Sequence, residues 1–510
     1  MQQRRHKSSS RKWYVLFSYL LLTTLYVSEA SPRFEVIADA GSTGTRIYVY
    51  AHDDESSVIL DTLKEISHLR LVPALSTFYS NYPDSSKLQE QIQQLVDFAT
   101  TKVPADMIAH TNISLKATAG LRTIPKEQQD WLVEEVRVVL RNSPFEFHDE
   151  NTKVIDGEEE SLYDFFAVKA ASHLPETENI LFNTSIVGSA RESGSAAAFN
   201  DNGFAAADLG GSSQQLAFLL PSQAPGDEQL CRPDWIISTP GGESLDVFAK
   251  SLNKLGLIAA MDQVLHLFYT SGPEGIRRTL VATEEKNIFA SHNSQIAVTA
   301  DGSTNSLGVD DIMGGVTVVD VAVSDMAVYA DDYHPCLPPG VFPNSDLNFL
   351  GDLPPILRGS GDFHQCRKLV QQMLQANNVT SVIDKNCAQH IGKKVIIGLD
   401  NFPKALEMLH LADAKLRLSP AEIAVKGELL CKRSWEGVLA DFPGFPNYRA
   451  QRACFSSAYI HTLLTDVFLV GELESAFLPL DSIEQEQMEL AWALGSAALS
   501  ALKSSIHRVA

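Results

Sequence analysis

The chain has 510 residues, of which 45% are apolar, and this is enough to build two domains with complete hydrophobic cores. Its formal net charge of −22 argues against DNA or RNA as the main partner, because neutralising a nucleic-acid backbone requires clustered Lys and Arg side chains. A small phosphate ligand is compatible with this charge, since local loops and a metal ion can bind it.

The N-terminus is typical of a secretory signal peptide. A basic stretch that ends at Lys12 precedes an apolar run, Trp13–Val27, and Ser28 and Ala30 form a small-residue cleavage site. This run is shorter than the roughly 20 residues of a membrane span, so residues 1–30 are predicted to be a signal peptide, with an uncleaved anchor as the alternative. A secreted protein, or one in the lumen of the endoplasmic reticulum or Golgi, agrees with glycosylation acceptors at Asn112, Asn183 and Asn378.

The next part of the chain alternates strands and helices, which predicts an α/β lobe over residues 31–178. A glycine- and hydroxyl-rich turn, Asp39–Arg46, lies between two apolar runs that are typical of strands. The elements expected after this turn are a helix at Lys87–Ala99, a strand at Ser114–Thr118, a helix at Lys126–Leu140, an extended segment at Phe145–Ile155 and a helix at Ser161–His173.

A second lobe, predicted over residues 179–480, repeats the pattern. The turn occurs again at Asp208–Gln215, and without a gap Asp39 aligns with Asp208 and Gly41 with Gly210. Glycines let the backbone approach a phosphate, and successive amide N–H groups form an anion-binding concavity. The Asp that opens each turn can hold a hydrated divalent cation. The Walker pattern of P-loop proteins is absent from the sequence.

The rest of the second lobe is predicted to be mainly helical. A short helix is expected at Gly194–Phe199, and residues 270–332 are interpreted as an insertion, in which Thr299–Thr304 mimics a phosphate loop but is expected to be an exposed turn. Residues 481–510 are expected to return to the first lobe, with Leu490–Leu502 as a packed helix and not a second membrane span. Helices are also expected at Arg367–Ala376, Lys404–Leu411, Ala421–Leu430 and Ser456–Phe468.

Two further segments contain side chains that are suited to catalysis. Lys116–Arg122 offers a hydroxyl, a glycine and a guanidinium after a strand, and Val154–Glu160 places three carboxylates where a strand meets a helix. Acidic residues also favour a helix N-terminus through its dipole, which is the purely structural alternative. Beside two phosphate loops, however, one Glu can deprotonate a water for phosphoanhydride hydrolysis, and a divalent cation can offset the charge of the transition state.

These segments together resemble the nucleoside triphosphate diphosphohydrolases, or apyrases, which remove terminal phosphates from nucleoside tri- and diphosphates outside the cytosol. The resemblance extends from Val36 to about Leu499. It implies two ribonuclease-H-like α/β lobes, as in actin, hexokinase and the heat-shock ATPases, with the nucleotide between them. The motifs that carry it are Asp39–Arg46, Ala117–Arg122, Gly157–Glu160, Asp208–Gln215, Cys454–Ile460 and Trp492–Gly495.

The resemblance also implies roles for individual residues. Glu160 would be the general base, with Ser213 and Gln215 placing the water, and Arg122 would hold the second of the six motifs in place. Calcium or magnesium would be bound through water by Asp39, Asp208, Thr118 and Trp492. Phosphate would be bound by Ser42, Thr43, Gly44, Thr45, Arg46, Gly210, Gly211 and Ser212.

Six cysteines, all in the second half of the chain, predict three disulfides in a secreted protein. The resemblance pairs Cys336 with Cys366 and Cys431 with Cys454, which leaves Cys231 with Cys387.

The chain departs from the family pattern at three places. Ser161 follows Glu160 where Gly is usual, and Gln214 replaces a typical Thr. Arg449 resembles a residue that stacks on the nucleobase, but its usual aromatic partner falls near Phe402, where the match is poor. Base preference, the preference for tri- or diphosphates and the oligomeric state stay open.

Three functions remain in view at this point. The first is a metal-dependent nucleotide phosphohydrolase with no obligate membrane partner. The second is a sugar kinase or polyphosphatase on the same fold, since a fold does not fix function. The third is a catalytically silent, secreted nucleotide-binding protein.

Overall fold

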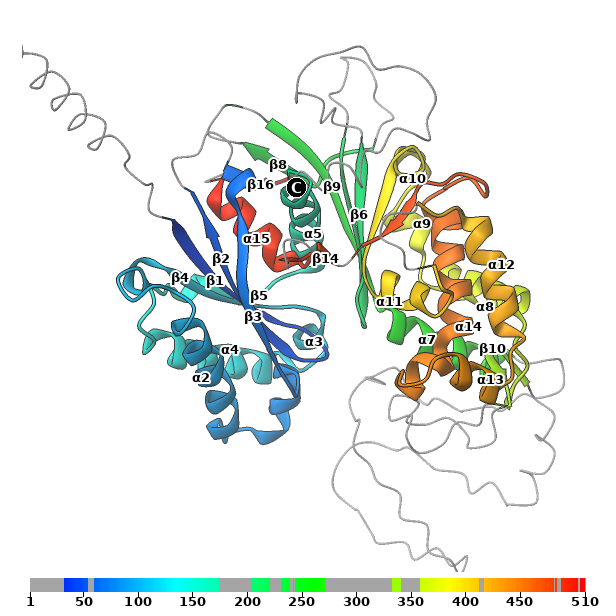
Figure 1. Ribbon diagram of the computed structural model, residues 1–510, viewed down its shortest axis with the longest axis horizontal. Coiled ribbons are helices and arrows are strands. Elements are labelled where there is room, and N and C mark those ends of the chain that lie inside the picture. The colour runs from blue at the N-terminus through cyan, green and yellow to red at the C-terminus, as the bar shows by residue number, and fades with distance from the viewer. Residues whose placement is uncertain are drawn as a thin grey trace, which may run out of the picture.

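The structure is a computed structural model that describes residues 32–53, 59–173, 203–220, 231–238, 242, 244–271, 333–340, 358–411, 417–480, 482–483, 488–502 and 505–509. In this part of the chain, two large β-sheets are surrounded by helices (Figure 1). The predicted signal peptide, the predicted helix at Gly194–Phe199 and nearly all of the predicted insertion at 270–332 lie outside the described residues. None of the described helices is long and apolar enough to cross a membrane.

The first sheet has the strand order β3-β2-β1-β4-β5. Strand β1 pairs with β2 in an antiparallel hairpin and with β4 in parallel. Two amphipathic helices, α2 and α4, bury Leu and Val side chains in a core shared with this sheet. The elements are β1 Arg33–Ala40, β2 Thr45–His52, β3 Lys64–Leu71, α2 Ser86–Thr100, β4 Asn112–Ala117, α3 Ala119–Arg122, α4 Lys126–Arg141 and β5 Thr152–Val154.

The second sheet has the order β13-β12-β6-β7-β9-β8-β16 and repeats the central arrangement of the first. Its β6 pairs with β7 in an antiparallel hairpin and with β12 in parallel. The register is also the same, because Asp39 faces Arg46 in one hairpin and Asp208 faces Gln215 in the other. The strands are β6 Phe204–Leu209, β7 Ser213–Leu219, β8 Trp235–Ser238, β9 Ser244–Asn253, β12 Val395–Asp400, β13 Phe477–Pro479 and β16 Ser505–Arg508.

Two helices, α5 (Gly157–Ala171) and α15 (Trp492–Ala501), lie between the two sheets (Figure 1). Both are buried on nearly every side and share one apolar core with residues of both sheets. Helix α15 corresponds to the helix predicted at Leu490–Leu502. The chain end after α15 adds β16 to the second sheet, where it pairs with β8.

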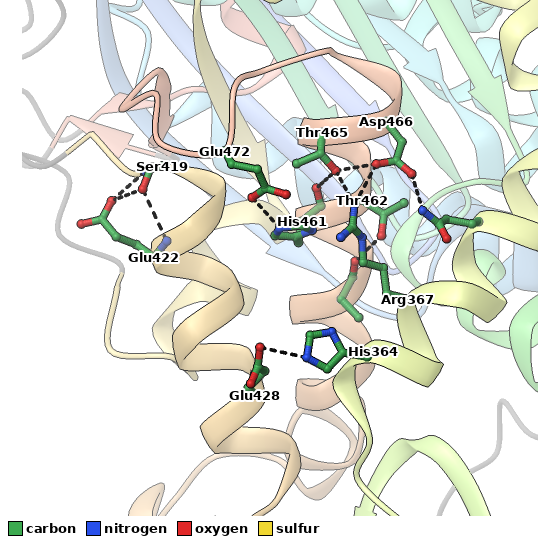
Figure 2. Close-up of polar contacts among 12 residues, drawn as sticks. His364, Arg367, Ser419, Glu422, Glu428, His461, Thr462, Thr465, Asp466 and Glu472 are labelled. Carbon is green, nitrogen blue, oxygen red and sulfur yellow. Dashed lines mark hydrogen bonds and ion pairs between the residues drawn. The ribbon is translucent and has the colours of Figure 1, made fainter.

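The helical part of the second lobe packs on the other face of the second sheet. Figure 2 shows polar contacts among its helices, including an ion pair of 3.0 Å between Arg367 and Asp466 and a contact of 3.1 Å between His461 and Glu472. The helices are α7 Leu257–Ser271, α8 Phe363–Ala376, α9 Val379–Val382, α10 Lys385–Ile391, α11 Asn401–Glu407, α12 Pro420–Cys431, α13 Trp435–Asp441 and α14 Asn447–Thr462, which continues into a π-helical turn at Leu463–Val467.

The three predicted disulfides are present, as Cys231–Cys387, Cys336–Cys366 and Cys431–Cys454. All six cysteines are buried in the core of the helical part, so the cross-links brace this half of the molecule. The remaining elements are two small sheets, formed by β10 Tyr333–Pro339 with β11 Arg358–Gly359 and by β14 Ser482–Ile483 with β15 Met488–Glu489.

Several predicted boundaries were wrong. Helix α14 begins at Asn447, nine residues before the predicted Ser456, α8 begins at Phe363 and not at Arg367, and α11 runs from Asn401 to Glu407 and not from Lys404 to Leu411. Of the extended segment predicted at Phe145–Ile155, only Thr152–Val154 forms a strand, because a 3-10 turn at Asp149–Asn151 interrupts it. The helix predicted from Ser161 begins four residues earlier, at Gly157, because the Asp156 side chain accepts a hydrogen bond from the backbone N–H of Glu159 and caps it. Glu160 therefore lies in the first turn of α5.

The contact between α5 and α15 leaves no space at Gly495, where an added Cβ would lie 1.7 Å from the carbonyl oxygen of Tyr163. We expect Gly495→Ala to force the helices apart and to lower the free energy of unfolding by about 1–3 kcal/mol. Urea denaturation measures this change. The matched control is Gly471→Ala, where the nearest atom would be 3.4 Å away. Equal midpoints for the two variants would contradict the close packing.

Candidate active site

The two glycine-rich loops touch each other. Each loop connects the strands of one hairpin, β1 to β2 and β6 to β7. A Cβ at Gly211 in the second loop would lie 3.2 Å from the Ser42 hydroxyl in the first, so the tips of the loops are in direct contact. The first loop is closed by a hydrogen bond of 3.0 Å from the Gly41 N–H to the Gly44 carbonyl. The duplicated motif therefore forms two facing halves of one site.

Glu160 is the only one of three consecutive carboxylates in α5 that faces these loops. The preceding two have partners elsewhere, since Glu158 lies 3.5 Å from Arg508 and Glu159 forms a 2.6 Å ion pair with Lys153. The Glu160 side chain is buried instead and is held by residues of the first and second lobes. Of the three carboxylates, Glu160 is therefore the candidate for a catalytic residue.

Three side chains bind Glu160 or lie beside it. Arg122 donates to the Glu160 carboxylate at 3.0 Å and to the Ser213 hydroxyl at 3.3 Å. Gln215 donates to the same Glu160 oxygen at 3.2 Å and to Ser213 at 2.7 Å. The structure thus brings together Glu160, Ser213 and Gln215, the residues predicted to be catalytic.

Burial raises the pKa of Glu160, and the adjacent Arg122 guanidinium opposes this rise. A second hydrogen bond of Arg122, to the Ile155 carbonyl at 2.9 Å, fixes the guanidinium at the end of β5. Beyond the predicted role of holding its own motif, Arg122 contacts Glu160 directly, and its positive charge favours the ionised form of this carboxylate.

The two Asp residues that open the loops carry carboxylate oxygens without a partner. In both Asp39 and Asp208 the Oδ1 atom is buried and accepts no hydrogen bond within the described structure. Burial raises the pKa of Asp39 to about 7, opposed by Arg46, whose guanidinium lies 3.7 Å from the other oxygen, and by a hydrogen bond from Trp492. The pKa of Asp208 is raised well above its usual value, by burial and then by the nearby carboxylate of Asp400.

Unpartnered buried carboxylate oxygens fit a divalent cation, because a positive charge would compensate their burial. In the described part of the chain, no three His, Cys, Asp or Glu side chains lie close enough to hold a metal ion directly. Carboxylate oxygens are among the ligands that hard divalent cations prefer. Thr118 follows β4 beside the first loop, and its N–H donates to the carbonyl of Ala40 at 3.2 Å.

The predicted phosphate-binding residues lie in the two loops or at the start of β2, and several of them are buried or already bonded within the protein. Thr45 is fully buried at the start of β2. Arg46 is paired with Asp39, so much of its charge is already compensated inside the protein. The carbonyls of Gly210 and Gly211 accept hydrogen bonds from the start of α7.

Asp164 and Asp400 also belong to this site, and the sequence analysis missed both. Asp164 lies one turn after Glu160 in α5, and Asp400 ends β12 next to the second loop. Burial, followed by the nearby carboxylate of Asp208, raises the pKa of Asp164 well above its usual value. The charge of Asp400 contributes to the raised pKa of Glu160 and of Asp208. Asp164 is the one acidic residue in an otherwise apolar stretch of α5, and Asp400 ends an apolar strand as Asp208 does, so both patterns were visible in the sequence.

The predicted nucleobase residue, Arg449, lies 3.6 Å from Glu407 and over the ring of Phe445, at 5.7 Å from its centroid. Phe402 is fully buried and packs against Phe477, with ring centroids 5.3 Å apart. Phe402 is therefore a core residue, and the aromatic neighbour of Arg449 is Phe445.

Two facing phosphate loops on duplicated sheets, with a buried Glu between them, define a two-lobed phosphohydrolase. The chain belongs to the GDA1/CD39 (nucleoside phosphatase) family, which it matches over residues 26–508. It is 25% identical to a protein named probable apyrase 5 of Arabidopsis thaliana, over 94% of this chain and 85% of the relative. It is 24% identical to the Golgi apyrase of Saccharomyces cerevisiae, over 94% of this chain and 71% of the relative.

The fold is that of a solved nucleoside triphosphate hydrolase from Neospora caninum, with a TM-score of 0.60 and 14% identity over 97% of each chain. These findings confirm the predicted family, the two-lobed α/β fold and the class of enzyme, a nucleotide phosphohydrolase.

Proposed function

We propose that this enzyme hydrolyses the terminal phosphates of nucleoside tri- and diphosphates, with a water activated by Glu160 and with calcium or magnesium as the cofactor. The observation that carries this proposal is the position of Glu160, which is buried between Arg122, Ser213 and Gln215 beside the contact of the two loops. The names of its relatives, apyrases and a Golgi apyrase, support nucleotides as substrates and the secretory pathway or the cell exterior as the location.

In this mechanism the phosphate chain lies against the backbone N–H groups and hydroxyls of both loops. Gln215 and Ser213 orient a water next to Glu160, and Glu160 takes its proton as the oxygen attacks phosphorus. The rise in the pKa of Glu160 through burial strengthens it as a base, while the charge of Arg122 favours its ionised form. A bound cation, held through water by Asp39 and Asp208 with Thr118 and Trp492 around it, would compensate charge on the phosphate oxygens.

The direct test is an assay of phosphate release by residues 31–510 made in an oxidising host. The substrates are ATP, ADP, GDP, UDP and polyphosphate, each with calcium, with magnesium and with a chelator. Metal-dependent release from nucleotides supports the proposal. Release from polyphosphate alone indicates a polyphosphatase, and nucleotide binding without release indicates a silent binding protein.

We expect Glu160→Gln to retain nucleotide binding and to lose at least about a hundredfold in kcat, because an amide cannot take the proton from water. Phosphate release gives the rate, and calorimetry gives the affinity for the nucleotide. Glu158→Gln is the matched control, since Glu158 pairs with Arg508 at 3.5 Å and should affect the rate little. An unchanged rate for Glu160→Gln would remove this residue from the role of base.

We expect Arg122→Gln to move the acidic limb of the kcat/KM profile to higher pH by about one unit, as for the loss of an opposite charge near a carboxylate. The sign follows from the pKa of Glu160, which Arg122 lowers. Without this guanidinium the base is protonated at a higher pH and activity is lost sooner as the pH falls. The measurement is the rate from pH 4 to 9, with the exposed Lys126→Gln as the control. A profile that keeps its acidic limb would argue against Glu160 as the titrating base.

We expect Asp39→Asn and Asp208→Asn to weaken metal binding, because each removes one anionic oxygen that has no partner in the protein. Calorimetric titration with calcium, in the absence of nucleotide, measures the affinity for the metal ion independently of activity. Asp130→Asn on the exposed face of α4 is the control. Unchanged calcium affinity in both variants would contradict the assignment of the cation site.

A further inference from the structure

Arg70 lies against the tip of the first phosphate loop. It is the next-to-last residue of β3, where it faces Arg46 of β2 in the sheet register. Its Nη2 atom donates to the carbonyl oxygen of Thr43 at 3.0 Å and to the Thr43 hydroxyl oxygen at 3.1 Å. The packing is close, because a Cβ at Gly44 would lie 3.0 Å from the Nε atom of Arg70.

The charges around the site distinguish Arg70 from the other cations there. Arg46 pairs with Asp39, Arg122 with Glu160, and Lys404 with Asp400. In each of these pairs a carboxylate of the protein already compensates much of the positive charge.

Arg70, in contrast, donates its hydrogen bonds to neutral groups, those of Thr43, and forms no ion pair with any described residue. Its side chain is exposed, and the site around it is rich in carboxylates. An anionic phosphate chain that enters between the loops needs positive charge beyond the paired residues, and Arg70 supplies it at the tip of the first loop.

The hydrogen bonds of Arg70 also affect Thr43. The Thr43 hydroxyl oxygen accepts from the guanidinium, so its own proton stays free to be donated to a phosphate oxygen. A guanidinium has five N–H donors, and the contacts with Thr43 use one of its three nitrogens. The remaining donors can bind phosphate while the loop keeps its position.

We propose that Arg70 is a further substrate-binding residue of this site, which binds the phosphate chain of the nucleotide and orients the Thr43 hydroxyl toward it. This inference rests on the proposed function, since it assumes that the two loops hold the phosphates. The contact is made both to the bound substrate and to the transition state. Its loss should therefore raise KM and leave kcat nearly unchanged.

The test compares Arg70→Gln and Arg70→Lys with the wild type. Gln keeps N–H donors but lacks the charge, whereas Lys keeps the charge, so the two variants together separate the effect of the charge from that of the planar guanidinium. We expect Arg70→Gln to raise the KM of a nucleoside diphosphate about tenfold, the lower end for a charged hydrogen bond, with kcat within about twofold. The KM of Arg70→Lys should lie between those of the wild type and Arg70→Gln, because Lys keeps the charge without the planar set of donors. The control is Arg141→Gln, an exposed arginine on α4.

Calorimetric binding of a non-hydrolysable nucleoside diphosphate analogue should show the same tenfold loss in Arg70→Gln. If KM and affinity equal those of the wild type, or if kcat falls at constant KM, the inference is overturned. If the wild type binds nucleotide but releases no phosphate, the proposed function fails, and the calorimetric comparison still tests Arg70.

Discussion

Five carboxylates lie around the place where the two loops meet, and the cost of burying them is the constraint to which the rest of the site responds. They are Asp39, Glu160, Asp164, Asp208 and Asp400, and the pKa values of the first four are raised by burial and by one another. Burying like charges in this way is unfavourable unless counter-charges are close. Three cationic side chains of the protein, Arg46, Arg122 and Lys404, offset part of this cost. A divalent cation would offset the remainder, and the unpartnered oxygens of Asp39 and Asp208 are where it would act.

The position of Glu160 depends on a helix that belongs to neither sheet alone. Helix α5 is buried on nearly every side and contacts α15 so closely that Gly495 meets the backbone at Tyr163. Its first residue, Gly157, lies against Ser251 of β9 in the second sheet, where an added Cβ would be 2.2 Å from that side chain. The first turn of α5 is therefore fixed from both lobes. Any movement of one lobe against the other would change the distance from Gln215, in the second lobe, to Glu160 and Arg122. The position of the proposed base relative to Gln215 therefore depends on how the two lobes are arranged.

Much of this could be predicted from the sequence, because it depended on local patterns. The loops at Asp39 and Asp208 have strand–turn–strand signatures, and the predicted gapless alignment appears in the structure as an identical register of the two hairpins. The three disulfides followed from the family resemblance. Errors arose where one hydrogen bond or turn decides a boundary, as in the cap from Asp156 that starts α5 before Ser161.

Contacts between distant segments could not be predicted in this way. Asp400 comes near Asp208 only because β12 lies parallel to β6, although 192 residues separate them in the chain. Arg70 meets Thr43 because β3 is the antiparallel neighbour of β2, and no turn motif marks it in the sequence. The aromatic neighbour of Arg449 could not be predicted for the same reason. Phe402 is the aromatic residue at the expected sequence position, but packing against Phe477 removes it from the surface, and Phe445 takes the place beside Arg449.

The distribution of charge also reconciles an acidic protein with an anionic substrate. With a net charge of −22, the chain as a whole repels nucleotides at long range, and this repulsion is weakened by salt. Binding must therefore come from groups at short range: loop N–H donors, a cation held between the carboxylates, and an arginine that is not already paired. Arg46 and Arg122 already compensate the carboxylates of Asp39 and Glu160, so they are less free than Arg70 to bind a substrate that enters and leaves. Arg70, an exposed cation at the tip of the loop, can bind phosphate and release it without breaking an internal ion pair. Substrate binding and internal charge compensation are thus carried out by different arginines.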